Sequence, residues 1–129
     1  MIRLSFIDLL YFFFTDLNQC RFDMIVNALD NHENRHLLSG QSWYKALTAW
    51  ANDSRAPVLS IDPPVEGGGI NAKWSLCLGL PLALSERCGQ PYLCDVGLPD
   101  LVFQACAITY QSPFAHKFVV PLHSIEASP

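Results

Sequence analysis

The residue best placed to carry chemistry is Asp62, which follows an apolar run and precedes two prolines. Residues Val58–Ile61 predict a buried strand, and Pro63 cannot continue a central strand. Ligands of open α/β sheets bind at the carboxyl ends of the strands. A carboxylate at such a position can act as a general acid or base. The alternative is a turn residue, because Asp is common before Pro in turns.

Phosphate binding is a second chemistry that the charged residues could support. The chain has 129 residues, a net charge of −4 and only eight Lys and Arg residues, which argues against a broad phosphate-binding face. Lys73, Arg87 and Lys117 could still gather into a local basic patch in the folded chain. The alternative is that these charges are scattered and solvated.

The cysteines and histidines do not form a metal-binding pattern. The five cysteines are odd in number and contain no C-x-x-C pair, which suits a reducing compartment: Cys20, Cys77, Cys88, Cys94 and Cys106. His32 and His36 have helical spacing, but no thiol or carboxylate pair stands at a matching distance. We therefore expect no metal site.

The apolar segment Ile2–Phe14 could be read as a membrane or signal sequence. A spanning helix needs about 20 apolar residues, and this run is shorter and is interrupted by Asp8. A secretory signal would need a small-residue cleavage site, and none stands before Asp16. We therefore expect no membrane association.

One amphipathic helix is predicted just before the strand that ends at Asp62. Apolar residues recur at helical spacing and predict one buried face: Trp43, Ala46, Leu47, Trp50 and Ala51. Ser39 or Ser42 is the expected N-cap, and residues 52–54 end the helix. Both tryptophans are expected in the core.

The rest of the chain alternates between strand and helix signals. Strands are expected at 22–29, 73–78, 92–96 (after a break at 89–91) and 118–120, with a short helix from Pro99 through Ala105. Strand, helix and strand at these spacings predict βαβ units and a mostly parallel sheet. At this length the chain forms at most one domain.

Four blocks in this order carry a resemblance: RAPVLSIDPP, AKWSLCLGLPLALS, GQPYLCDVGLPDLVFQ and YQSPFAHKFVVPLHS. They resemble the C-terminal part of a YjeF N-terminal domain, from about Phe22 to Ser124. The resemblance implies a partial Rossmann-like three-layer α/β fold that lacks the first half of its sheet. Residues 1–21 are then a non-homologous apolar segment, and residues 125–129 are a tail.

Catalytic members of this family epimerise hydrated NADH and NADPH. Asp62 matches the family's acid, but the family's Asp-x-Pro-Ser-Gly motif reads Asp-Pro-Pro-Val-Glu here. Asn27 matches a family aspartate near the bound cation and ligand, and the phosphate-binding loop lies upstream of the matched part. Asn27 and Asp62 are therefore at most vestigial cofactor-binding residues. We expect no catalysis and no cofactor; a degenerate epimerase-like enzyme or a truncated, non-functional fragment is the alternative.

Within the family, the blocks most resemble the version carried by a scaffold of mRNA decapping. That resemblance implies a non-catalytic, cytoplasmic module of processing bodies that forms homodimers and contacts RNA. The decapping enzyme complex and a DEAD-box helicase would bind scaffold segments outside this chain. The candidate RNA contacts are Lys73, Arg87, His116 and Lys117.

Large aromatic residues are the candidate anchors of the dimer interface, because such residues dominate interface energetics. They are Trp74, Tyr92, Phe103, Tyr110 and Phe114, with the core as the alternative location. Without the first half-sheet, the strand at 22–29 would have a bare edge. The isolated chain is therefore expected to be marginally stable or prone to aggregation.

Overall fold

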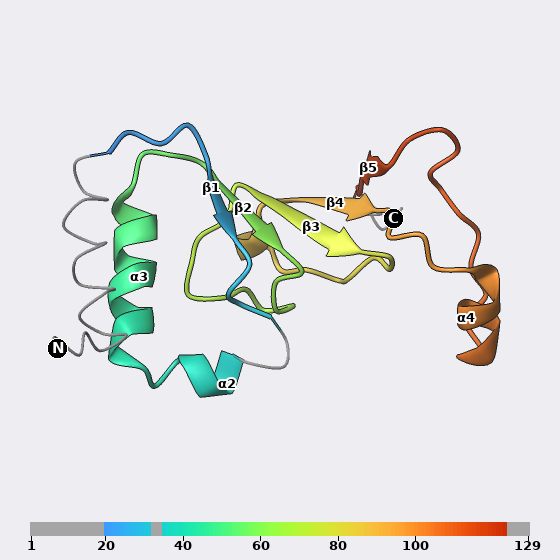
Figure 1. Ribbon diagram of the computed structural model, residues 1–129, viewed down its shortest axis with the longest axis horizontal. Coiled ribbons are helices and arrows are strands. Elements are labelled where there is room, and N and C mark those ends of the chain that lie inside the picture. Colours follow the sequence, from blue (N-terminus) through green and yellow to red (C-terminus); the bar gives the residue numbers. More distant parts are fainter. Residues whose placement is uncertain (1–19, 32–34, 124–129) are drawn as a thin grey trace, which may run out of the picture.

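The computed structural model describes residues 20–31 and 35–123, which fold around one five-stranded sheet (Figure 1). The strands are β1 (Ile25–Asn27), β2 (Val58–Ile61), β3 (Trp74–Leu78), β4 (Gln90–Cys94) and β5 (Val119–Pro121). They lie in the order β1-β2-β3-β4-β5; the first four are parallel and β5 runs antiparallel to β4. The predicted α/β class with a mostly parallel sheet is confirmed.

The described helices are α2 (Arg35–Leu38), α3 (Ser42–Asp53), α4 (Asp100–Ala105) and the 3₁₀ helix η1 (Glu86–Cys88). Helix α3 ends where the sequence predicted, and the N–H of Ser54 donates to the carbonyl of Trp50 at 3.0 Å. The predicted serine cap is wrong. Gln41 occupies the N-cap position without a side-chain hydrogen bond, and Ser42 is already helical.

The buried face of α3 is rotated from the predicted one. Tyr44 and Ala51 are only 6% and 2% exposed, whereas Ala46 is exposed and both tryptophans are half-buried. Ala51 packs against Val58 and Ile70, and Trp50 covers the side of that cluster. A small residue allows the helix to approach the sheet closely, which leaves the large indole rings at the rim of the core.

Four predicted strands have different bounds in the structure. β1 is shorter than the predicted 22–29, β3 begins one residue later than predicted, and β5 is shifted by one residue to 119–121. β4 begins at Gln90, inside the predicted break, and ends at Cys94 rather than at 96. Gly89 has φ 68°, a left-handed conformation that lets the chain enter the strand at once. The N–H of Gln90 then donates to the carbonyl of Lys73 at 3.0 Å. Pro91 is tolerated because it lies near the start of its strand.

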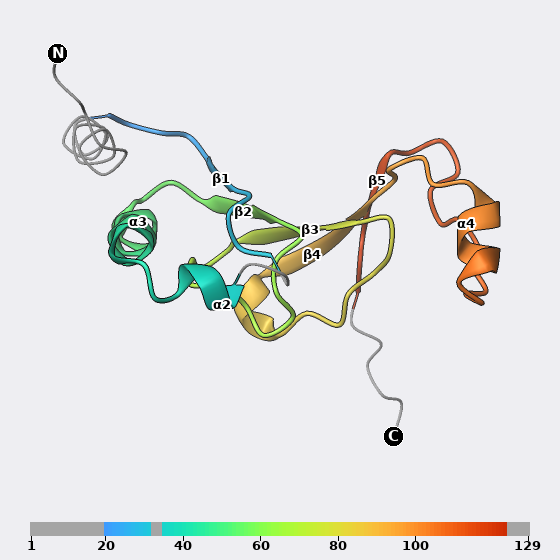
Figure 2. The same ribbon diagram turned by 60° about the horizontal axis from the view of Figure 1, so that its bottom comes forward.

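The two faces of the sheet differ sharply in exposure. Residues paired across parallel strands share a face, and one face carries six buried side chains: Asn27, Val58, Ser60, Ser75, Cys77 and Leu93. The opposite face carries Val26, Leu59, Ile61, Trp74, Leu76, Leu78, Gln90, Tyr92 and Cys94, none of which is buried. In Figure 2, α2 and the loops between β2, β3 and β4 lie below the sheet. The described residues thus supply two of the three layers of the expected fold.

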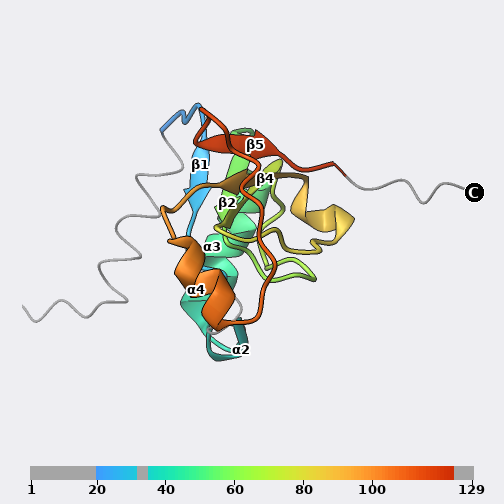
Figure 3. The same cartoon turned by 90° about the vertical axis from the view of Figure 1, so that its right-hand side faces the viewer.

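A second cluster forms the core under β3 and β4. Cys77, Leu93 and Phe114 are buried together, and Tyr110 and Val120 pack against them. Helix α4 lies beyond the carboxyl ends of these strands, nearest the viewer in Figure 3.

The aromatic residues predicted as interface anchors fall into two groups. Phe103 and Phe114 are core residues, at 4% and 3% exposure. Trp74, Tyr92 and Tyr110 are half-buried.

Candidate functional site

Asn27, at the carboxyl end of β1, is the centre of a buried polar network. Its side chain is 4% exposed, and its Nδ2 donates to Ser60 Oγ at 3.1 Å and to Asp30 Oδ2 at 3.4 Å. Its Oδ1 accepts a hydrogen bond from the N–H of Leu29 at 3.1 Å. The amide therefore uses both its donor and its acceptor atoms to join the ends of β1 and β2.

The network continues through Asp30 to helix α3. Asp30 is 1% exposed, and the Tyr44 hydroxyl donates a hydrogen bond to its Oδ1. The same hydroxyl accepts from the N–H of Gly69 at 3.2 Å. A buried carboxylate is costly unless it is hydrogen-bonded, and here it links β1, α3 and the Gly67–Gly69 loop.

Sequence reasoning assigned no role to Asp30, Tyr44 or Ser60. In the part of the chain that the structure describes, every buried side-chain nitrogen and oxygen has a hydrogen-bond partner. The hydrogen bonds within the network therefore satisfy its buried polar groups, and the network acts as a structural cross-link. Asn27 lies at a strand end as expected, but its use by a cofactor stays a prediction.

Asp62 directly follows β2 and is half-buried in a left-handed turn. Its φ is 48°, and its N–H donates to the carbonyl of Leu76 at 2.8 Å. The buried Pro63 and Pro64 follow it. Asp62 thus stands at the carboxyl edge of the sheet, as predicted, in the conformation of a tight turn.

Cys77 lies in β3 with no exposed surface. Burial raises the pKa of its thiol, and electrostatic interactions with Asp62 and Cys88 raise it further, while a hydrogen bond from the Leu82 backbone lowers it. A buried thiol with a raised pKa is neutral at pH 7 and a poor nucleophile. Cys77 therefore acts as a small core residue.

The four predicted RNA contacts fall into two separate pairs, all of them exposed. Lys73 precedes β3, and Arg87 lies in η1 just before β4, so both stand at the amino ends of parallel strands. His116 and Lys117 precede β5, whose Val119 pairs with the last residue of β4. The five residues of β4 separate the pairs by roughly 13 Å.

No metal centre is found within residues 20–31 and 35–123, where no three His, Cys, Asp or Glu side chains gather. His36 is exposed, and His32 lies outside the described residues. Over the same ranges, no helix is long and apolar enough to cross a membrane.

Comparison with known proteins shows that this chain is similar in sequence to decapping enhancers. The chain is 59% identical over 111 residues to "Enhancer of mRNA-decapping protein 3" of Gallus gallus, covering 84% of this chain and 22% of that protein. The chain is homologous to one region of this decapping enhancer. The Homo sapiens decapping enhancer gives the same identity and coverage. That of Drosophila melanogaster is 32% identical over 114 residues, covering 61% of this chain and 17% of its own length.

The homology to the decapping enhancer concerns only part of that protein, because the chain spans about a fifth of the length of the relatives it matches. No family model matches the chain. The resemblance to YjeF N-terminal domains therefore remains a proposal, and so do the activities of the whole decapping enhancer.

Proposed function

We propose that this chain is a non-catalytic module of an mRNA-decapping scaffold, which forms homodimers and contacts RNA in cytoplasmic processing bodies. Homology to decapping enhancers supports the decapping context. The module would be the C-terminal part of a YjeF N-terminal domain at residues 22–124. The decapping enzyme complex and a DEAD-box helicase would bind other segments of the scaffold.

The exposed face of the sheet is the observation that carries the proposed self-association. Its strand residues include Val26 at 53% and Leu78 at 41% exposure, and none of its strand positions bears a charge. Parallel sheets are normally covered on both faces, because each exposed apolar face costs hydration free energy. A second copy related by a two-fold axis would bring the same apolar face against itself.

Self-association would give the scaffold a means of raising avidity. Two copies present every linear binding segment twice, which strengthens multivalent binding without any new contact. No enzymatic step is needed for this role. The hydrogen bonds already made by Asn27 and Asp30 support a structural rather than a catalytic use of the strand ends.

The decisive experiment is sedimentation velocity on the full chain. We expect a concentration-dependent dimer, which a Val26→Glu and Leu78→Glu double variant converts to a monomer with unchanged circular dichroism. Leu37→Glu is the matched control, because Leu37 is 62% exposed on α2, away from this face. A monomeric wild-type chain, or a double variant that still dimerises, would contradict the proposed surface.

A further inference from the structure

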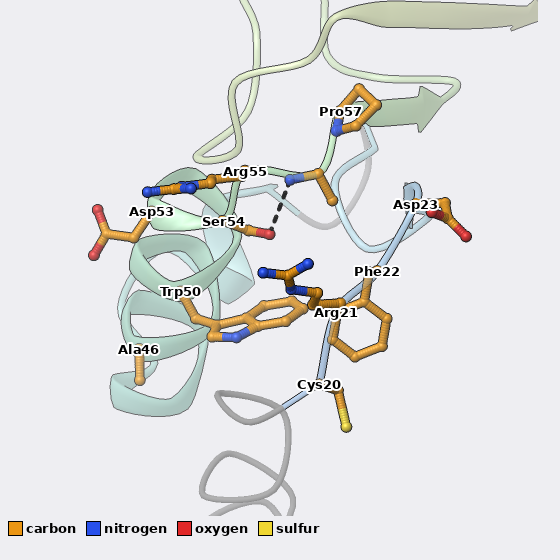
Figure 4. Close-up of a pocket in the computed structure, with 11 residues that line it drawn as sticks. Cys20, Arg21, Phe22, Asp23, Ala46, Trp50, Asp53, Ser54, Arg55 and Pro57 are labelled. Atoms are coloured by element: carbon orange, nitrogen blue, oxygen red, sulfur yellow. Dashed lines mark hydrogen bonds between the residues drawn. The ribbon is translucent and has the colours of Figure 1, made fainter.

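A pocket of about 840 Å³ opens at the amino ends of β1 and β2, between α3 and the segment that leads into β1 (Figure 4). This edge of the sheet is opposite to the one that carries Asn27 and Asp62. The side chains that give the pocket its chemistry are Arg21, Phe22, Asp23, Trp50, Asp53 and Arg55. The volume falls within the range that holds small organic ligands.

Two aromatic rings form one wall of the pocket. The rings of Phe22 and Trp50 meet edge to face, with centroids 5.9 Å apart and planes at 85°. Phe22 lines the pocket and is 38% exposed. A flat heterocycle can stack on such a ring, and stacking of one nucleic-acid base contributes roughly 1–3 kcal/mol.

Paired charges line the rest of the pocket. Arg21 and Arg55 are exposed guanidinium groups from two separate segments, and guanidinium binds phosphate through two parallel hydrogen bonds. Asp23 and Asp53 can accept hydrogen bonds from ribose hydroxyls. Because these four charges sum to zero, the pocket suits a ligand with a single phosphate better than a polyphosphate.

The same edge of the sheet carries more positive charge beyond the pocket. Each of the four parallel strands is preceded by one exposed basic residue: Arg21 before β1, Arg55 before β2, Lys73 before β3 and Arg87 before β4. Neighbouring strands lie about 4.8 Å apart. The topology therefore aligns residues from distant parts of the sequence into a row of cations that begins at the pocket.

We propose that this pocket holds one nucleotide of a single-stranded RNA, whose backbone continues along the amino ends of β2, β3 and β4. The base stacks against Phe22 beside Trp50, and its phosphate lies between Arg21 and Arg55. A row of cations next to an aromatic pocket favours a strand over a free mononucleotide. This inference rests on the proposed RNA contact and assigns it to one edge of the sheet.

The test is binding of a fluorescent hexauridylate to the full chain at low salt. Arg55→Gln and Phe22→Leu should each weaken binding roughly tenfold, through a lost phosphate contact and a lost stacking surface. Arg55→Gln should also reduce the slope of log affinity against log salt by about 0.7. Lys45→Gln is the matched control, because it removes one exposed charge on α3 at a residue that does not line the pocket.

The possible results distinguish a wrong binding site from a wrong function. RNA binding that Arg55→Gln and Phe22→Leu leave unchanged overturns the pocket but keeps the RNA contact. Absence of any RNA binding overturns both. Uridine monophosphate that binds as tightly as the hexamer overturns the strand along the edge.

A cross-linking measurement on the unmodified chain does not depend on the folding of variants. RNA carrying 4-thiouridine should cross-link to peptides that contain residues 20–23 or 46–57. Cross-links confined to residues 110–123 would overturn the proposed site.

Discussion

A side chain on Gly68 cannot coexist with the buried carboxylate of Asp30, because an added Cβ would lie 2.3 Å from Asp30 Oδ2. The Tyr44 hydroxyl donates to the other carboxylate oxygen, Oδ1, and the Asn27 amide donates to Oδ2. The glycine loop after β2 and the turn after β1 therefore fit only when residue 68 has no side chain.

Gly68→Ala should lower the free energy of unfolding by about 1–3 kcal/mol, the usual cost of overpacking a filled site. Urea unfolding followed by tryptophan fluorescence measures this change. Gly40→Ala is the control, because nothing lies within 4 Å of the added Cβ there. Equal stability of the two variants would show that the loop does not pack on Asp30.

Tyr44→Phe should lower the free energy of unfolding by about 1–3 kcal/mol, because Asp30 loses a hydrogen-bond donor while it stays buried. A double-mutant cycle with Asp30→Asn should give a coupling of at least about 0.5 kcal/mol. Tyr110→Phe is the control, since the Tyr110 ring stacks on Phe103 and its hydroxyl makes no hydrogen bond within the described residues. Additive effects of Tyr44 and Asp30 would rule out the direct contact.

Substitutions at Asp62 test whether this position contributes to stability through its backbone conformation or through its carboxylate. A non-glycine residue in a left-handed conformation carries a backbone cost of roughly 1 kcal/mol, and Asp62 has φ 48°. Asp62→Gly should therefore be as stable as the wild type, whereas Asp62→Val should lose about 1–2 kcal/mol more. Thermal unfolding of both variants gives the comparison. A strong loss in the glycine variant would instead assign the stabilisation to the carboxylate.

The sequence predicted those elements whose signals are local. β2 has the predicted bounds because its apolar run ends at a left-handed residue and two prolines. Helix α3 followed from its apolar spacing, although the face that it buries depends on how closely Ala51 approaches Val58. The start of β4 was missed because Gly89 makes its turn within a single residue.

The candidate sites could be recognised only once the order and directions of the strands were known. Asp30 and Tyr44 are fourteen positions apart, and no periodicity in the sequence relates a turn carboxylate to a helical hydroxyl. Likewise, the row of basic residues becomes visible only when β1 to β4 are known to lie side by side and parallel. The separation of Lys73 from Lys117 follows from the antiparallel direction of β5.

Cys77 should react with a thiol reagent far more slowly than Cys106 at pH 8. Burial, aided by the charge of Asp62, raises the pKa of the Cys77 thiol, so the reactive thiolate is scarce and inaccessible. Cys106 is exposed at the end of α4. Mass spectrometry after brief alkylation locates the modified residue, and urea should abolish the difference.

The raised pKa of Cys77 also sets a sign for the pH dependence of stability. Because the folded thiol holds its proton to higher pH than the unfolded one, its contribution is complete below the unfolded pKa of about 8.5. It is then lost as the pH rises above that value, since the unfolded chain releases the proton first. Raising the pH from 7 to 10 should therefore lower the free energy of unfolding of the wild type more than that of Cys77→Ala. Urea unfolding at each pH measures both. Parallel curves for the two proteins would show that Cys77 titrates normally and is not sealed within the core.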